Sequence, residues 1–209
     1  KETELTPPTP DPEPTPDKPE ADVEVKGDAP TIKNDADTVK EIESSVKLTD
    51  EEKEAVKAGA DIKFKIVVKD EVKAGDKELI DTKISSLVNN GVVGKVFDIT
   101  IEKQVGNNAA VKAEFNSEIT LKVQVPEELI NKDDSKTRTY KVIRVHDGEV
   151  TVIDKENCVF DEETGLITFK TDKFSTYAIV YEDAAKTVVT PGNLSLIHIS
   201  EPTRPEPIS

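Results

Sequence analysis

Apolar side chains recur at every second residue in several stretches of this chain, and this pattern limits the fold more than any other feature. Residues 119–125 read ITLKVQV, and residues 62–69 read IKFKIVVK. A period of two places alternate side chains on opposite faces of an extended strand, so one face packs while the other meets solvent. Turn sequences such as Asp147-Gly148 separate these stretches. We therefore expect an antiparallel β-sandwich, Ig-like or related.

Helix signals are confined to the N-terminal half of the chain. Thr38 with Glu41 and Thr49 with Glu52 each match a capping box, in which the threonine oxygen accepts from a first-turn amide and the glutamate bonds back. Residues 76–88 predict a further helix with Asp76 as its N-cap and apolar residues on one face. The expected fold class is mainly β with minor α, a sandwich with two or three short helices in the N-terminal half.

The first twenty residues differ in composition from the rest. Residues 1–20 read KETELTPPTPDPEPTPDKPE and hold 7 of the 13 prolines, with six acidic residues against two lysines. Proline fixes φ, like charges extend the chain, and the segment has too little apolar area to form a core. We expect a disordered Pro-rich acidic linker that acts as a stalk-like spacer. The alternative is a ligand for a protein that reads proline motifs.

The apolar pattern ends near Asp183. Residues 174–181 carry apolar side chains on both faces and predict a buried closing strand, whereas Pro191-Gly192 breaks any continuation. We therefore expect one domain at 21–183 and a linker at 184–193, with nothing after Asp183 needed for folding. Residues 194–204, LSLIHISEPTR, resemble the translation of a sequencing-library adapter. Residues 194–209 are accordingly expected to be a non-native tail.

Charge and composition exclude several classes of partner. The formal net charge is -15 and no basic stripe is present, so nucleic acid is not expected to bind. No apolar run reaches the length of a membrane span, so no direct membrane insertion is expected. The single cysteine, Cys158, is expected to be a buried strand residue. Since the chain holds no methionine, we expect it to begin inside a longer reading frame.

Two groups of residues are candidates for chemistry, and each has a simpler interpretation. His146 beside Asp147 could be a base with its orienting carboxylate, or a residue that flanks a tight turn. Asp133-Asp134 and Asp161-Glu162-Glu163 could bind calcium, or carry solvated turn charge. Because no nucleophile motif or ligand spacing accompanies them, we expect no catalytic, cofactor-binding or metal-binding residues. An intramolecular isopeptide bond remains an alternative for which no triad can be named.

Aromatic residues decide whether carbohydrate recognition is expected. The chain has no tryptophan, three tyrosines and six phenylalanines. Four phenylalanines lie on apolar strand faces and are expected in the core, namely Phe64, Phe97, Phe115 and Phe169. Tyr140, Tyr177 and Tyr181 are the candidate ligand contacts, because an exposed aromatic ring can stack on a sugar. The alternative for all three is a role in the core or at a sheet edge.

Three segments carry a family resemblance. Residues 137–154 (TRTYKVIRVHDGEVTVID), 169–183 (FKTDKFSTYAIVYED) and 48–69 (LTDEEKEAVKAGADIKFKIVVK) resemble a module near the C-termini of large surface proteins of Gram-positive gut bacteria. The resemblance covers residues 23–183. It implies a non-catalytic extracellular structural module, attached to the bacterial cell surface, that presents neighbouring domains of the same polypeptide. The alternative is an adhesin-like module that binds polysaccharide or a host surface protein.

Overall fold

Two β-sheets and three helices make up the fold in the computed structural model, which describes residues 21–153 and 155–186. The Pro-rich segment 1–20, residues 187–193 of the expected linker and the tail 194–209 lie outside the described residues. In chain order the elements are β1 (Ala21–Lys26), α1 (Ala36–Ser45), α2 (Asp50–Lys57), β2 (Ile62–Lys69), α3 (Ala74–Leu87), β3 (Val92–Val105), β4 (Val111–Lys112), β5 (Ile119–Gln124), the 3-10 turn η1 (Glu127–Leu129), β6 (Lys136–His146), β7 (Glu149–Val152), β8 (Cys158–Asp161), β9 (Leu166–Thr171) and β10 (Thr176–Ala185).

The strands form one large and one small sheet. The large sheet has the order β1-β2-β3-β10-β6-β7, with the short β4 also paired to β3, and the small sheet has the order β5-β9-β8. Only β1 and β2 are parallel among the described strand pairs, whereas the other pairs are antiparallel. The expected mainly β, sandwich-like fold with three short helices is confirmed.

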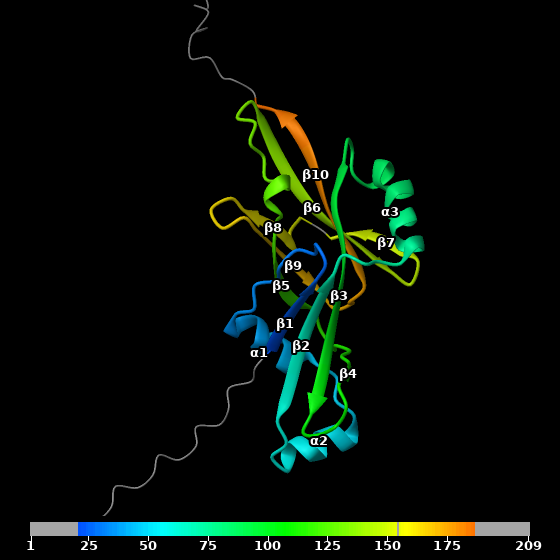
Figure 1. Cartoon of the computed structure of the whole chain (residues 1–209), viewed down its shortest axis with the longest axis vertical. Helices are drawn as coiled ribbons and strands as arrows, with labels where there is room; N and C mark the ends of the chain where they lie inside the picture. Colours follow the sequence, from blue (N-terminus) through cyan, green and yellow to red (C-terminus); the bar gives the residue numbers. More distant parts are fainter. Residues whose placement is uncertain (1–20, 154, 187–209) are drawn as a thin grey trace, which may run out of the picture.

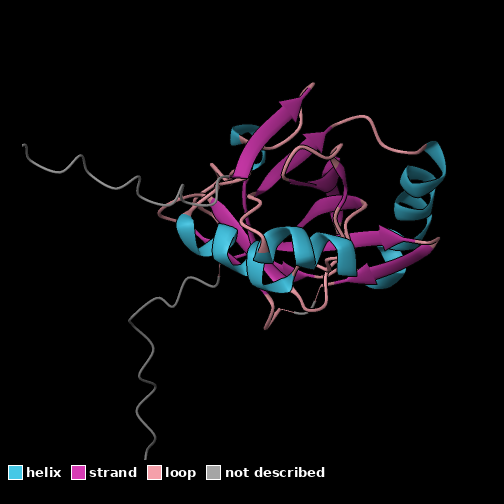
Figure 2. Ribbon diagram, turned by 90° about the horizontal axis from the view of Figure 1, so that it is seen from below, coloured by secondary structure: helices cyan, strands magenta, loops and turns pink. Residues whose placement is uncertain are grey.

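The main core lies between the two sheets. The inward residues of the alternating stretches meet there, and Ile42 of α1 packs with them. The expected core phenylalanines are all buried, at 2% exposure for Phe64, 0% for Phe97, 7% for Phe115 and 1% for Phe169. Figure 2 shows the helices at the periphery of the strands.

A second, smaller core lies on the other face of the large sheet. Ile80, Ile84 and Val88 form one buried cluster with Ile143, Val145, Ala178 and Val180. The central strand β10 is therefore covered on both faces, because its alternate residues Tyr177 and Ile179 belong to the main core. This agrees with the apolar residues that the sequence places on both faces of this strand. Figure 1 shows α3 beside β3 and β7.

The first helix begins earlier than the capping-box pattern predicts. Its N-cap is Asp35, whose carboxylate accepts from the Thr38 amide and hydroxyl at 3.0 Å each. The capping box predicted at Thr38 and Glu41 is wrong. Glu41 instead accepts from the Thr120 amide of β5 at 2.5 Å, so its carboxylate holds a strand edge.

Of the other two predicted helix caps, the one at α2 is present and the one at α3 is absent. Thr49 and Glu52 form the predicted capping box at the start of α2, with bonds of 3.2 and 2.7 Å. Asp76 does not cap α3, which begins at Ala74 without a side-chain cap. The Asp76 carboxylate accepts instead from the Thr176 hydroxyl of β10 at 2.7 Å. A tertiary bond has thus replaced the local one.

The hairpin between β6 and β7 is the predicted two-residue turn. Asp147 and Gly148 have φ values of 50° and 77°, the left-handed conformation that this turn requires at both positions. By contrast, the closing strand continues past Tyr181, where the sequence pattern ends it, and past the expected domain boundary at Asp183. Ala184 and Ala185 pair with β6, and the Lys186 amide donates to the Ser135 carbonyl at 2.8 Å.

Candidate functional site

Tyr177, a candidate ligand contact, lies in the main core. Its side chain is fully buried, with ring centroids 6.0 Å from Phe97 and 5.4 Å from Phe169. The hydroxyl donates to the Lys173 carbonyl and lies 2.9 Å from the Thr171 hydroxyl. Burial raises the pKa of Tyr177 well above its ordinary value. Its interpretation as a ligand contact is therefore corrected to a core role.

Tyr140 is also a core residue. It is 7% exposed, and its ring centroid lies 4.3 Å from that of Phe160. Its hydroxyl donates to the Leu129 carbonyl at 2.6 Å, which satisfies the one polar atom of the side chain and anchors η1 against β6. Burial raises the pKa of Tyr140. Neither Tyr140 nor Tyr177 offers an open ring face on which a sugar could stack.

Tyr181 is partly exposed, but one face of its ring is covered. The Arg138 guanidinium carbon lies 3.8 Å from the ring centroid. Arg138 also donates from Nε and Nη2 to the Asp183 carboxylate at 2.7 Å each, and from Nη1 to the Leu129 carbonyl at 2.8 Å. This ion pair holds the pKa of the Asp183 carboxyl below its ordinary range. The arginine is thus engaged in holding β6, β10 and η1 together.

His146 ends β6 beside the predicted turn. Its Nε2 lies 3.4 Å from the Asp147 carboxylate, and its Nδ1 is buried without a hydrogen-bond partner among the described residues. A hollow of about 360 Å³ adjoins the ring. Its lining consists of Lys47, Lys112, Ala113, Glu114, Phe115, His146, Asp172, Lys173 and Phe174. None of these residues supplies a hydroxyl or thiol nucleophile to which His146 could act as a base.

The acidic loops use their carboxylates locally. Asp133 accepts from the amide and hydroxyl of Ser135 at 3.0 and 2.5 Å, and Asp161 accepts from the Glu163 amide at 2.9 Å and the Thr164 hydroxyl at 2.8 Å. These bonds lower the pKa of both carboxyl groups. Within the described ranges no three His, Cys, Asp or Glu side chains are grouped as metal ligands would be. The loop aspartates therefore stabilise turns.

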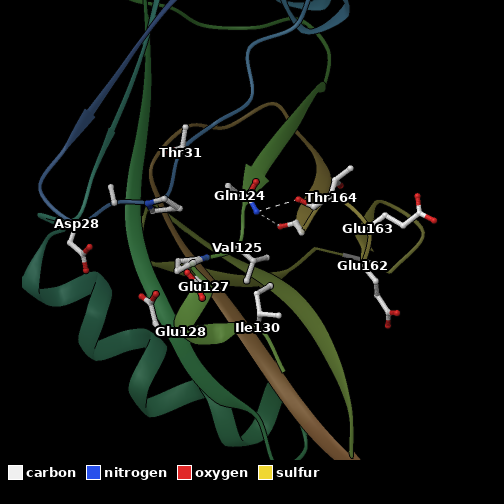
Figure 3. Close-up of a pocket in the computed structure, with 14 residues that line it drawn as sticks. Asp28, Thr31, Gln124, Val125, Glu127, Glu128, Ile130, Glu162, Glu163 and Thr164 are labelled. Carbon is white, nitrogen blue, oxygen red and sulfur yellow. Dashed lines mark hydrogen bonds between the residues drawn. The ribbon is translucent and has the colours of Figure 1, made fainter. Parts of the chain in front are cut away.

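Figure 3 shows a cleft of about 440 Å³ between the loop after β1, the end of β5 and the turn after β8. Gln124 at its centre donates to the Gly165 and Thr164 carbonyls at 2.9 and 3.4 Å. The Glu162 and Glu163 side chains point away from Gln124 in this view. The lining residues are Asp28, Ala29, Pro30, Thr31, Gln124, Val125, Pro126, Glu127, Glu128, Ile130, Glu162, Glu163, Thr164 and Gly165. They include five carboxylates and no aromatic ring.

Cys158 is buried, as expected. Its burial raises the pKa of the thiol to about 11, so the reactive thiolate is scarce near neutral pH. The thiol is therefore a packing group beneath a hollow of about 580 Å³ that Arg138, Tyr140 and Phe160 also line.

Lys103 is a buried polar residue that sequence reasoning overlooked. It is 7% exposed, and its ammonium bonds the Glu52 carboxylate of α2 and the Lys47 carbonyl. The sequence pattern could have revealed this burial. Every second residue from Phe97 to Ile101 faces the core, and Lys103 occupies the next position in that series along the same strand. A lysine at an inward position indicates a buried ionic partner.

The path of the chain through the fold is the most distinctive geometric feature. β1 is parallel to β2, β2 is antiparallel to β3, and β3 is antiparallel to β10. The strands β1 and β10 therefore run in the same direction within one sheet. The chain enters at the start of β1 and leaves at the far end of β10, as Figure 1 shows.

The separation of these two points follows from the register. Ala21 lies level with Phe64 and hence with Lys103 of β3, whereas Tyr181 lies level with Val92. Eleven steps along β3 and four more along β10 lead to Ala185, which at about 3.3 Å per residue gives about 50 Å along the strands. The points at which the chain enters and leaves the domain are thus far apart along the strand direction of one sheet.

Comparison of the chain with protein-family models, with curated proteins and with solved structures gives no match. Among the helices that the structure describes, none combines the length and the apolar character needed to cross a membrane.

Proposed function

We propose that this chain is a non-catalytic structural module of an extracellular bacterial surface protein, which holds the neighbouring parts of its polypeptide a fixed distance apart. The observation that carries the proposal is the common direction of β1 and β10 in one sheet. A domain whose chain enters and leaves at opposite ends adds its own length, about 50 Å, to a stalk. A domain with adjacent ends adds almost none.

The packing supports the same proposal. Residues 176–181 of β10, the strand by which the chain leaves the domain, pair with β3 on one side and with β6 on the other, and both faces of this stretch carry buried residues. The last residues of the strand, up to Ala185, pair with β6 alone among the described strands. The three candidate tyrosines do not form an open aromatic platform. The extracellular, surface-attached location is supported by the Pro-rich segment 1–20 and by the resemblance of residues 23–183 to surface-protein modules.

Distance measurement between spin labels tests the spacer geometry. Cysteines introduced at Asp22 and Ala184 lie on exposed positions near the two ends of the fold. In the full chain, Asp22→Cys with Ala184→Cys should give one narrow distance distribution near about 45 Å, as estimated from the strand rise of about 3.3 Å and the strand spacing of about 4.8 Å. A broad distribution, or a mean well below this value, would contradict a rigid spacer.

Binding and turnover assays test the non-catalytic role. The full chain should bind no member of a panel of polysaccharides and host surface proteins, and it should not hydrolyse generic ester, peptide or glycoside substrates. Saturable binding that Tyr181→Ala abolishes would favour the adhesin-like alternative instead. Turnover that His146→Ala abolishes would show an enzyme.

A further inference from the structure

We infer that the large sheet carries tension along its strands, so that its ladders are loaded in shear, and that the parallel β1–β2 ladder is the part that breaks first. The inference rests on the proposed spacer function, because only a module within a stretched chain is pulled from both ends. Tension applied through the chain acts downward on the start of β1 and upward on the end of β10 in the view of Figure 1.

The direction of the pull follows from the sheet geometry. Three strand spacings separate β1 from β10, which at about 4.8 Å each is about 14 Å across the sheet. The separation along the strands is about 50 Å, so the pull has a larger component along the strands than across them. Under such a pull the hydrogen bonds of a ladder share the load, whereas a pull across the strands breaks them one after another.

The strand with the least support on this path is β1, because it pairs with β2 alone in the part of the chain that the structure describes. β10 has ten register pairs with β6 and six with β3, whereas β1 has six pairs with β2 and, among the described strands, no second neighbour. The ion pair of Glu24 with Lys65, at 2.6 Å, spans this ladder. Beyond the strand, the Asp28 amide donates to the Asp70 carboxylate at 2.8 Å, and the Lys95 ammonium pairs with Asp28.

The backbone of β1 offers a matched pair of positions for a test. The Lys26 carbonyl accepts from the amide of Asp70, the residue directly after β2. The backbone groups of every second residue in a strand point to the same side, so the Glu24 amide also faces β2. The Ala21 carbonyl accepts from the Asn34 side chain on the other side, so the Val25 amide faces the open edge. Proline lacks the amide hydrogen. Glu24→Pro therefore removes a backbone bond of the ladder together with the Glu24–Lys65 ion pair that spans it, whereas Val25→Pro removes only a donor on the open edge.

Single-molecule pulling on the full chain tests the inference. Handles on Asp22→Cys and Ala184→Cys pull the ladder in shear, and handles on Asp22→Cys and Lys63→Cys peel β1 from the same end of β2. The native Cys158 is buried and the pKa of its thiol is raised to about 11, so it should react much more slowly near neutral pH than the introduced cysteines at exposed positions. We expect the unfolding force in shear to exceed the peeling force several-fold.

The proline variants test whether the β1–β2 ladder is the part of the sheet that breaks first under force. In the shear geometry, Glu24→Pro should lower the unfolding force towards the peeling value, whereas Val25→Pro should leave it nearly unchanged. Chemical denaturation of both variants checks that a general loss of stability does not cause the difference. Equal forces in the two geometries, or equal effects of the two prolines, would overturn the inference. A spacer of fixed length would survive that result, because label distances and binding panels test it separately.

Discussion

Lys103 and Glu52 form a buried ion pair that joins the large sheet to α2, with Nζ 2.5 Å from Oε2. Their side chains are only 8% and 15% exposed. Nζ also donates to the Lys47 carbonyl at 2.6 Å, and Glu52 accepts from the Thr49 amide. One carboxylate thus caps a helix and fixes that helix to β3.

Removing one partner of this pair should destabilise the fold strongly. Lys103→Met leaves the Glu52 carboxylate largely buried without its cation, and the free energy of unfolding should fall by about 3 kcal/mol. The matched control is Lys57→Met, which breaks the Lys57–Glu54 pair whose side chains are 71% and 72% exposed. Chemical denaturation measures both. Adding Glu52→Gln to Lys103→Met should recover part of the loss, and equal effects of the two lysine variants would contradict the buried pair.

Acid should weaken the anchoring of α1. Asp35 caps α1, and the nearby Lys122 ammonium, 2.5 Å away, is the main cause that lowers the pKa of its carboxyl from 3.8 to about 2. Because the folded-state pKa is depressed, the stabilisation is complete above the unfolded value and disappears as pH falls from about 4 to about 2. It amounts to about 1–2 kcal/mol.

Unfolding experiments over this pH range compare the parent chain with Asp35→Asn, which keeps a capping side chain but has no charge to titrate. The slope of stability against pH should be smaller in the variant. Lys122→Met should reduce the slope as well, because it removes the cation that depresses the pKa. An unchanged slope in both variants would show that this pair does not contribute to acid sensitivity.

The buried hydroxyl of Tyr177 should matter more than the partly exposed one of Tyr181. Tyr177→Phe leaves the Lys173 carbonyl and the Thr171 hydroxyl without their bond to this side chain, which should cost about 1–2 kcal/mol of unfolding free energy. Tyr181→Phe keeps the ring under Arg138 and should change stability by less than about 0.5 kcal/mol. Denaturation midpoints of the two variants provide the comparison. A larger loss at Tyr181 would contradict the packing described here.

The end of β10 should contribute measurably to stability. A chain that ends at Asp183 loses the pairing of Ala184 and Ala185 with β6 and the bond from the Lys186 amide to Ser135. Compared with a chain that ends at Lys186, its unfolding free energy should be lower by about 1 kcal/mol, since these residues are exposed and each bond contributes modestly. Identical stability of the two chains would show instead that the domain ends at Asp183, as the sequence predicts.

Local patterns in the sequence determined the fold class and much of the secondary structure. Period-two alternation in residues 62–69 and 119–125 predicted strands that the structure contains, and Asp147-Gly148 predicted a turn with two positive φ values. The capping box of Thr49 and Glu52 is also present. These features depend on residues close together in the chain, so their physical causes are visible in the sequence.

Tertiary structure decided which polar side chains act locally and which act at long range. Glu41 and Asp76 matched helix caps in the sequence, yet their carboxylates bond Thr120 and Thr176 on distant strands. Tyr140 and Tyr177 differ little from Tyr181 in local pattern, and only sheet packing buries the first two. The common direction of β1 and β10 depends on strand order, which no local pattern specifies. The spacer proposal rests on this feature, because strand order arises from contacts between residues far apart in the chain.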